Sequence, residues 1–549
     1  MYFCRPTYNI YHMKQYILAL IILGTFTLQA QFFNGQIDQI DIQAYRFFIQ
    51  INDTNNLIKA HTQIDFKTLQ AVRQISLNLK NKGNNGKGMQ VTKVLDDKGE
   101  TLDFIHQNDS LKIQLPRLQS GDSFSLEIYY EGIPADGLYI KKNMFGQRTF
   151  FGDNWPARAQ YWLPVIDHPS DKALVEWDIT APRHYSVIAS GRLTEKTVLP
   201  QAYRYHFKTA VPLATKVMVM AAADFQIKNL ETLKLHGNCV PVSSWIYAQS
   251  PVSAFDDFAC STGILKFYDS LNGAYAYQKL ANVQSNTRFG GMENAGNIFY
   301  DEKAVNGTHR IENLVAHEIA HQWFGNSVTE KNWRDIWLSE GFATYLTDLY
   351  LEHRYGTQKL QERMAMERRK VIRYNRFNSR PVVYDETENL MRLLNPNSYE
   401  KGAWVLHMLR QKTGDKTFFK ILKTFYETYR NKNASTEDFI RLAKKNSEQN
   451  LQTFFQQWLY RSGFPRLKID KEITGNKLRI SIEQISDIYT LELPVKLQSG
   501  NQSIIKILPV HKKNQNFEIK IPRSFDKEKL QIIIDPEVKV LFQELQKLI

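Results

Sequence analysis

Cysteine is scarce in this sequence: only Cys4, Cys239 and Cys260 occur among its 549 residues. Three cysteines cannot provide a disulfide framework, so the fold must be stabilised by buried apolar side chains. A chain of this length exceeds a single hydrophobic core and predicts about two to four domains. Cys4 lies in a predicted leader. For Cys239 and Cys260, one disulfide and two free buried thiols are equally consistent with the sequence.

Long apolar runs are rare as well, and none after residue 30 is long enough to span a membrane. Residues 16–28 form a short apolar run behind Lys14, which is typical of the core of a secretory signal peptide. We therefore predict a signal peptide over residues 1–30, with Met13 as an alternative start. The protein is then exported, either periplasmic or secreted, and has no stable membrane span after leader removal. A retained N-terminal anchor is the alternative interpretation.

No dense run of Lys or Arg and no low-complexity linker occurs, although the formal net charge is +14. Arg5 and Lys14 supply two of these charges and leave with the leader. No nucleic-acid-binding motif accompanies the surplus, so it predicts a solvated basic surface and no nucleic-acid partner. Attraction to an anionic polysaccharide or lipid is a weaker alternative.

The apolar patterning divides the chain into three parts. Alternating or short buried runs predict strands at residues 44–51, 123–130, 173–180, 216–221, 478–483 and 518–521. Helical periodicity predominates from about residue 250, at residues 254–271, 310–324, 339–350, 358–375, 399–412, 417–430 and 436–445. We predict an α+β multidomain protein, with an N-terminal antiparallel β domain (31–237), a mostly α domain (238–463) and a small C-terminal β domain (464–549).

The segment that begins HEIAH carries the strongest chemical signal. His317 and His321 are four positions apart, and Glu340 follows after eighteen intervening residues. Side chains four apart share one face of a helix, so both imidazoles can reach one ion. Two imidazoles and a carboxylate suit Zn²⁺, with the fourth position left for water. We predict one zinc site with these three ligands, and the spaced glutamate argues against a helix with two chance histidines.

Glu318 lies beside the first of these histidines and is free to act on the water instead of binding the metal. Gly325 and Asn326 predict the end of the first helix, and Ser339 predicts the N-cap of the next one. Asn326 and Asp335 are candidates for groups that support the ligands, although structural capping is the favoured interpretation.

Two further segments contain groups that suit peptide chemistry. Residues 290–294 read GGMEN before a strand-like stretch; paired glycines let a backbone approach a ligand, and an edge strand binds extended peptides. Glu293 beside that edge has two interpretations of equal weight. It would hold a cationic group, or it is an ordinary turn carboxylate. Tyr399 begins a predicted helix, and its hydroxyl suits hydrogen bonding to an oxyanion, although most tyrosines at such positions are packing residues.

Taken in order, these motifs resemble those of the M1 family of zinc aminopeptidases. Residues 290–294 are similar to its G-[AG]-M-E-N motif, residues 317–340 to its H-E-x-x-H-x18-E motif, and residues 399–403 (YEKGA) to the segment with its catalytic tyrosine. The resemblance covers most of residues 37–549. It implies an N-terminal β domain, a thermolysin-like catalytic domain and a C-terminal β-sandwich.

The resemblance also implies a role for each site residue. His317, His321 and Glu340 would bind one Zn²⁺, and Glu318 would be the general base and Tyr399 the oxyanion donor. The substrate, a peptide with a free N-terminus, would be bound by Gly290, Gly291, Met292, Glu293 and Asn294, with Glu293 on the α-ammonium.

The sequence departs from the family in two respects. It ends after the last β segment, where many members continue into a large helical domain. Members also place a Gln or Glu of the first domain on the substrate amine, and here Asp153 and Asn154 are the uncertain counterparts. Three alternatives stay open: an endopeptidase, which an ammonium site at Glu293 would exclude, a catalytically idle binding protein, and an epoxide hydrolase side activity.

Overall fold

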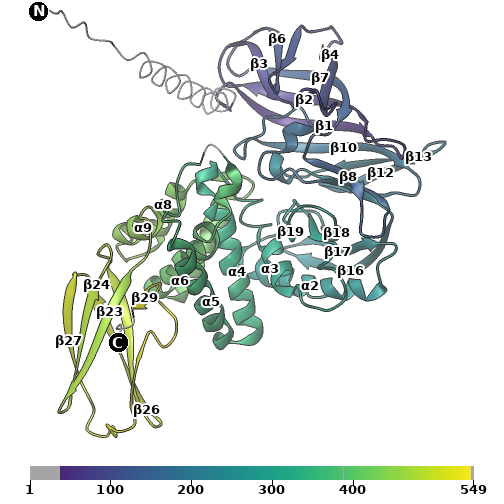
Figure 1. The fold of residues 1–549 in the computed structure, drawn as a ribbon. Helices are drawn as coiled ribbons and strands as arrows, with labels where there is room; N and C mark the ends of the chain where they lie inside the picture. The colour runs from purple at the N-terminus through teal and green to yellow at the C-terminus, as the bar shows by residue number, and fades with distance from the viewer. Residues whose placement is uncertain (1–36, 387–388, 546–549) are drawn as a thin grey trace, which may run out of the picture.

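The computed structural model describes residues 37–386 and 389–545. The predicted signal peptide therefore lies outside the described residues. Figure 1 shows a β-rich N-terminal part, a middle part in which helices predominate, and a C-terminal pair of sheets on the side of the helices away from the first part. Among the described residues, no helix is both long and apolar enough to cross a membrane. Cys239 and Cys260 are both free thiols.

The N-terminal part is built around one large sheet in the order β12-β13-β10-β1-β2-β7-β4, with β14 paired to β10. Its strands are β1 (Ile40–Gln50), β2 (Ile58–Thr68), β4 (Gly88–Asp96), β7 (Ser123–Ile133), β10 (Lys172–Pro182), β12 (Arg192–Val198), β13 (Ala202–Lys208) and β14 (Leu213–Ala214). Two smaller sheets comprise β3 (Val72–Asn78), β5 (Phe104–Gln107) and β6 (Ser110–Leu118), and β8 (Leu138–Lys142), β9 (Arg148–Gly152), β11 (Ser186–Ala189) and β15 (Met220–Ala223). Most neighbouring strands are antiparallel, as predicted, but β1 and β10 pair in parallel.

The middle part combines a five-stranded sheet with eight described α-helices. The sheet runs β16-β17-β18-β20-β19, with β16 (Phe225–Leu235), β17 (Asn238–Tyr247), β18 (Leu280–Ser285), β20 (Asn297–Asp301) and β19 (Gly291–Met292). The helices are α2 (Ser261–Asn272), α3 (Glu312–Ala320), α4 (Trp337–Tyr355), α5 (Thr357–Asn375), α6 (Gly402–Thr413), α7 (Asp415–Tyr429), α8 (Thr436–Asn446) and α9 (Gln452–Leu459). The predicted boundary at residues 237–238 falls in the turn between β16 and β17, within this one sheet.

The C-terminal part consists of two sheets whose apolar faces meet. One contains β23 (Arg466–Thr474), β24 (Lys477–Gln484), β27 (Asn514–Lys520) and β29 (Gln543–Leu545), and the other β25 (Leu491–Ser499), β26 (Gln502–Val510) and β28 (Leu530–Ile534). Leu478, Ile480 and Ile482 alternate along β24, as Leu493, Val495 and Leu497 do along β25, and all six lie in one core. That core continues into the helices of the middle part.

Several local predictions need correction. Residues 216–221 are not one buried strand, because residues 215–217 form a 3-10 helix before β15. Residues 254–271 divide into a 3-10 helix and α2. The zinc-motif helix ends at Ala320, earlier than residue 324. Ser339 is not the N-cap of α4, which begins at Trp337. In contrast, the helix predicted at residues 436–445 is present as α8, and Ser435 and Asp438 form a capping box at its start.

Two lysines, the half-buried Lys172 and the buried Lys216, connect the N-terminal and middle parts. The Lys216 ammonium lies 2.5 Å from Glu330 Oε1, and both side chains are almost completely buried. Lys172 Nζ donates to the carbonyl oxygens of Asn326 at 3.0 Å and Ser327 at 2.8 Å. Asn326 and Ser327 belong to the turn after the HEIAH segment. These contacts therefore fix the first β domain beside the predicted site.

Helices α4 and α6 approach each other through two glycines. A Cβ built on Gly341 would lie 2.9 Å from Gly402 Cα and 3.0 Å from the Ser398 carbonyl oxygen. Both neighbours are backbone atoms, which cannot move aside as a flexible side chain can. The missing side chains therefore let Glu340, on α4, come close to the chain around Tyr399.

We expect Gly341→Ala to destabilise the protein by about 1–3 kcal/mol, the usual cost of overpacking. The matched control is Gly263→Ala, since Gly263 is also helical but a Cβ added there would have no heavy atom of another element within 4 Å. Thermal unfolding should show a lower midpoint for Gly341→Ala and an unchanged or higher one for the control. Equal midpoints for the two variants would contradict this account of the helix contact.

Candidate active site

The three predicted metal ligands converge in the structure from two helices. His317 lies on α3, His321 follows its last turn, and Glu340 lies in the first turn of α4. The two Nε2 atoms are 3.1 Å apart. Glu340 Oε2 lies 3.6 Å from His317 Nε2 and 3.3 Å from His321 Nε2. The segment between the helices thus folds back and closes a triangle of three donor atoms.

The size and chemistry of this triangle fit one zinc ion. Tetrahedral ligands about 2.0–2.2 Å from Zn²⁺ lie about 3.3–3.6 Å from each other, close to the distances given above. Glu340 is buried, and its Oε2 faces the two imidazoles. A buried carboxylate between two histidines is further stabilised by a cation. His317, His321 and Glu340 are therefore suited to hold one Zn²⁺ ion.

The ring of His321 is oriented by contacts on its far side. Its Nδ1 lies 3.0 Å from Ser339 Oγ and 3.2 Å from the Phe324 carbonyl oxygen. These contacts point Nε2 at the other ligands. Gly325 makes room for this arrangement: it has a φ of +117°, and a Cβ there would meet Ser339 Oγ and His321 Nδ1. Ser339 thus contacts a ligand from inside the first turn of α4.

The ionisable groups of the site shift one another's pKa values. Burial lowers the pKa of His317. At His321 burial acts in the same direction, but the carboxylates of Glu340 and Glu293 outweigh it and raise the pKa to about 9. Burial opposes ionisation of Glu340, yet the two imidazoles hold its pKa well below the usual range. A dication at the triangle would replace the proton on His321 as the partner of these carboxylates.

Glu318 lies on α3 and faces Gly291 of β19. A Cβ on Gly291 would collide with Glu318 Oε1, so the carboxylate occupies the space that a side chain would fill. Burial, with a further contribution from Glu293, raises the pKa of Glu318 well above its usual range. The carboxylate is therefore poised to take up a proton inside the site.

Glu293 is buried at the end of the GGMEN segment. Its Oε1 has no hydrogen-bond partner among the described residues, and its side chain lines the same cavity as the histidines. Its carbonyl oxygen accepts from Gln322 Nε2 at 2.8 Å and Asn326 Nδ2 at 2.6 Å. Gln322 was not predicted as a site residue. The only feature of the sequence that pointed to it is its position directly after the HEIAH segment.

The rest of the GGMEN segment lies at the edge of the middle sheet. Gly291 and Met292 form β19, which pairs with β20 and is the last strand of the sheet order. The strand is short and leaves one edge open to a cavity of about 230 Å³, which Gly290, Gly291 and Met292 help to line. Asn294 is fully buried and its side-chain amide has no partner among the described residues.

Tyr399 lines the same cavity as Gly291 of β19. It belongs to a π-helical turn at residues 397–401 that leads into α6, and not to a regular helix start as predicted. Its ring is stacked on that of His317, with centroids 6.0 Å apart. Burial, followed by the negative charges of Glu340 and Glu293, raises the pKa of the Tyr399 hydroxyl well above its usual range, so it stays a hydrogen-bond donor at neutral pH.

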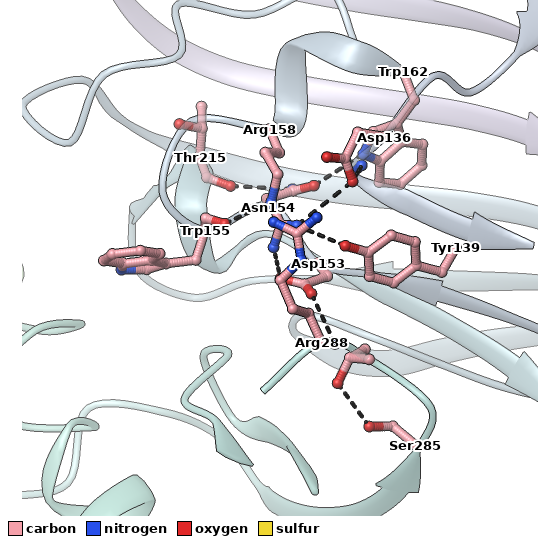
Figure 2. Close-up of polar contacts among 12 residues, drawn as sticks. Asp136, Tyr139, Asp153, Asn154, Trp155, Arg158, Trp162, Thr215, Ser285 and Arg288 are labelled. Atoms are coloured by element: carbon pink, nitrogen blue, oxygen red, sulfur yellow. Dashed lines mark hydrogen bonds and ion pairs between the residues drawn. The ribbon is translucent and has the colours of Figure 1, made fainter. Parts of the chain in front are cut away.

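Asp153 and Asn154 are fully buried in the first domain, and both side chains already have polar partners. Asn154 Nδ2 donates to the carbonyl oxygens of Thr215 and Met218, and its Oδ1 accepts from Trp162 Nε1. Asp153 pairs with Arg158 (Figure 2). Asp335 is likewise structural, because its Oδ1 accepts from the backbone and hydroxyl of Thr436.

A largely buried His-His-Glu cluster beside an open strand edge, in a mostly helical part between β domains, fits a zinc metallopeptidase. The sequence matches the Peptidase M1 N-terminal domain over residues 42–217 and the Peptidase family M1 domain over residues 258–458. The chain belongs to peptidase family M1.

Individual relatives agree with this assignment. Human (Homo sapiens) glutamyl aminopeptidase is 26% identical over 373 residues, which cover 64% of this chain and 39% of that protein. A probable aminopeptidase 2 of Sulfurisphaera tokodaii is 24% identical and covers 86% of this chain and 61% of its own length. The match thus spans 39% and 61% of the length of these two curated relatives, less than two thirds in both cases.

Solved structures share the fold. The M1 zinc metallopeptidase of Deinococcus radiodurans has a TM-score of 0.67 and 24% sequence identity, and the match covers 78% of this chain and 95% of that one. A mutant of that enzyme bound to a Tyr-Ser-Ala substrate gives a TM-score of 0.68 at 23% identity.

We expect Ser339→Ala to weaken zinc binding by about 10–100-fold, because the hydroxyl orients a ligand ring from behind. Thr347→Val is the matched control, since it removes another buried hydroxyl of α4, which donates to the Ala343 carbonyl oxygen. Competition with a chromogenic chelator measures the zinc affinity of both variants. An affinity in Ser339→Ala equal to that of the control would show that the hydroxyl does not position His321.

Proposed function

We propose that this protein is a zinc aminopeptidase that removes single residues from the N-terminus of peptides. The observation that carries the proposal is the position of Glu293: a buried carboxylate oxygen without a partner among the described residues, in one cavity with the zinc site and beside an open strand edge. An ammonium group is the partner that such an oxygen requires, and a charge-assisted hydrogen bond would hold it firmly.

The register of cleavage follows from this arrangement. A peptide that adds to the edge of β19 would be bound through main-chain hydrogen bonds. Its free α-ammonium would meet Glu293, so the chain could not continue beyond the first residue in that direction. The first peptide bond would then lie over the zinc site, which excludes internal cleavage.

The reacting groups would be divided among three positions. Zn²⁺ at His317, His321 and Glu340 would polarise the scissile carbonyl and acidify the attacking water. Glu318 would take the proton of that water and later deliver it to the leaving amine, in keeping with its raised pKa. Tyr399 would donate a hydrogen bond to the developing oxyanion.

We also propose that the protein is exported through the leader at residues 1–30, with a mature chain that begins near Gln31. The support is the short apolar run behind Lys14. N-terminal sequencing of the mature protein tests this, and an intact leader in the membrane fraction would exclude it.

The roles of base and ligand are separable by mutation. Glu318→Gln should retain zinc but lose turnover by about 10²-fold or more, since an amide cannot accept the proton. His317→Ala should lose the zinc itself. Metal content after dialysis and kcat on an aminoacyl chromogenic substrate distinguish the two variants. A zinc-loaded Glu318→Gln with normal kcat would remove Glu318 from the reaction, and full zinc in His317→Ala would exclude that ligand.

The function itself is tested by the products from a long peptide. Mass spectrometry over time should show a ladder of single-residue losses from the N-terminus. N-acetylation removes the ammonium and adds bulk, so it should slow cleavage strongly. Glu293→Ala should reduce this discrimination by slowing the free-amine peptide. Internal fragments from the start would indicate an endopeptidase, and no cleavage by the zinc-loaded protein would indicate a binding protein.

A further inference from the structure

Tyr399 belongs to an irregular stretch of backbone. Residues 397–401 form a single π-helical turn before α6, and the backbone N–H of Lys401 donates to the Pro396 carbonyl oxygen, five residues back, at 2.8 Å. Single π-helical turns are rare overall and occur often at functional sites. Such a turn is less favourable than a regular α-helical one, so contacts with neighbouring elements must hold it in place.

Every other side chain of this turn is bound to another part of the chain. The contacts join Asn397 to Asn375 and the Arg380 carbonyl oxygen, Ser398 to the Leu393 carbonyl oxygen, Glu400 to Lys370, and Lys401 to the carbonyl oxygens of Arg461 and Gly463. Tyr399 lines the cavity instead, and its ring is stacked on that of His317. The side chain that faces the zinc site is thus surrounded in sequence by side chains that fix the turn.

Lys401 makes the most unusual of these contacts. The residue is completely buried, with an exposed fraction of 0%. Its ammonium donates to the Gly463 carbonyl oxygen at 2.8 Å and to the Arg461 carbonyl oxygen at 3.2 Å, and it has no ion-pair partner among the described residues. Burying a cation is costly, and two neutral acceptors compensate for only part of that cost. Stability alone therefore does not account for a lysine at this position.

The two acceptors lie in the link between the middle and C-terminal parts. Residues 460–465 connect α9 to β23, and Gly463 has a φ of +76° there. Between the two acceptors, the Ser462 carbonyl oxygen accepts from the hydroxyl of Tyr489, a residue of the C-terminal part, at 3.2 Å. The link is therefore held both by Lys401 and by the C-terminal part.

A second contact fixes the turn to α5. Lys370 Nζ lies 2.7 Å from Oε1 of Glu400, the residue directly after Tyr399. The Glu400 side chain is 12% exposed, whereas the Lys370 side chain is 51% exposed. The two residues that follow Tyr399 thus bind the turn to two different elements, α5 and the link after α9.

We propose that Lys401 is a positioning residue for Tyr399, and that the Lys370–Glu400 pair assists it. Together they hold the Tyr399 hydroxyl at one place in the cavity, and a displacement of about 1 Å is enough to cost about 10²-fold in rate. This inference rests on the proposed function, in which Tyr399 donates to the oxyanion. It adds that the link to the C-terminal β domain contributes to the rate through Lys401.

Lys401→Met tests the inference, because it keeps an unbranched stem and removes both hydrogen bonds. With an aminoacyl chromogenic substrate, kcat should fall at least tenfold, whereas KM and zinc content should stay within twofold of wild type. The reason is that the displaced hydroxyl acts mainly in the transition state. In a Tyr399→Phe background the same substitution should change kcat less than twofold, since no hydroxyl is left to position.

Lys279→Met is the matched control. Lys279 is a half-buried lysine outside the cavity, and its ammonium also donates to two oxygen atoms, the Ala189 carbonyl oxygen and Asn297 Oδ1. Any effect of this substitution on kcat should be the same factor with and without the Tyr399 hydroxyl.

Lys370→Met decides the question if Lys401→Met does not fold, because the half-exposed Lys370 side chain can be replaced without opening the core. It should lower kcat about threefold, in line with the modest energy of a partly exposed ion pair. In the Tyr399→Phe background this loss should disappear. An equal loss in both backgrounds, or none in either, would overturn the inference.

The outcomes separate this inference from the function on which it rests. If the wild-type protein cleaves no aminoacyl substrate, the proposed function fails, and if Tyr399→Phe has a normal kcat, the role of Tyr399 in it fails. If Tyr399→Phe is impaired but Lys401→Met lowers kcat by one factor in both backgrounds, Lys401 is only structural: the inference is overturned and the function stands. A Lys401→Met protein with normal kcat, or one that loses its zinc, overturns it as well.

Discussion

The burial of three carboxylates in one small cavity is the constraint on which the rest of this structure depends. Glu293, Glu318 and Glu340 are each almost completely buried. Carboxylates so close together cannot all be ionised in a low-dielectric setting without compensation. Their environments differ: Glu340 faces two histidines, Glu318 has a raised pKa, and Glu293 has an oxygen without a hydrogen-bond partner among the described residues. In the proposed function, these different environments would give the three carboxylates three different roles.

Such a cluster requires close packing of the backbone around it. Gly291 leaves room for the Glu318 carboxylate, Gly325 for the contact between Ser339 and His321, and Gly341 for the approach of α6. A side chain at any of these positions would displace a functional group or the backbone that carries it. The glycines near the motifs are therefore part of the site geometry, although none of them has a reactive group.

The first β domain contributes to the site as directly as the helices do. Phe151, Trp155 and Val219 of that domain share a hydrophobic core with Val283, Met292 and Phe299 of the middle sheet. Lys172 and Lys216 add directional contacts across the same boundary. The cavity is thus formed between two parts of the chain, and these contacts fix the position of the first β domain beside it. The C-terminal sheets extend the core of the helices on the opposite side.

Local sequence patterns were enough to predict the metal ligands and the order of the β and α parts. The spacing of His317, His321 and Glu340 reflects helix periodicity, a local property, so it predicted the metal site before any fold was known. Alternating apolar residues likewise predicted β1, β7 and β24, and helical periodicity predicted α8. Local patterns failed where the backbone departs from regular periods, as at the π-helical turn with Tyr399 and the 3-10 helix at residues 215–217.

Which side chains meet depends on the packing of whole elements. Ser339 is of a residue type that often caps helices, yet it contacts His321 because α4 begins two residues earlier and folds against α3. Gln322 and Asn326 donate to the Glu293 carbonyl oxygen across about thirty residues of sequence. Contacts between residues distant in sequence depend on how whole elements pack, and neither propensity nor periodicity contains that information.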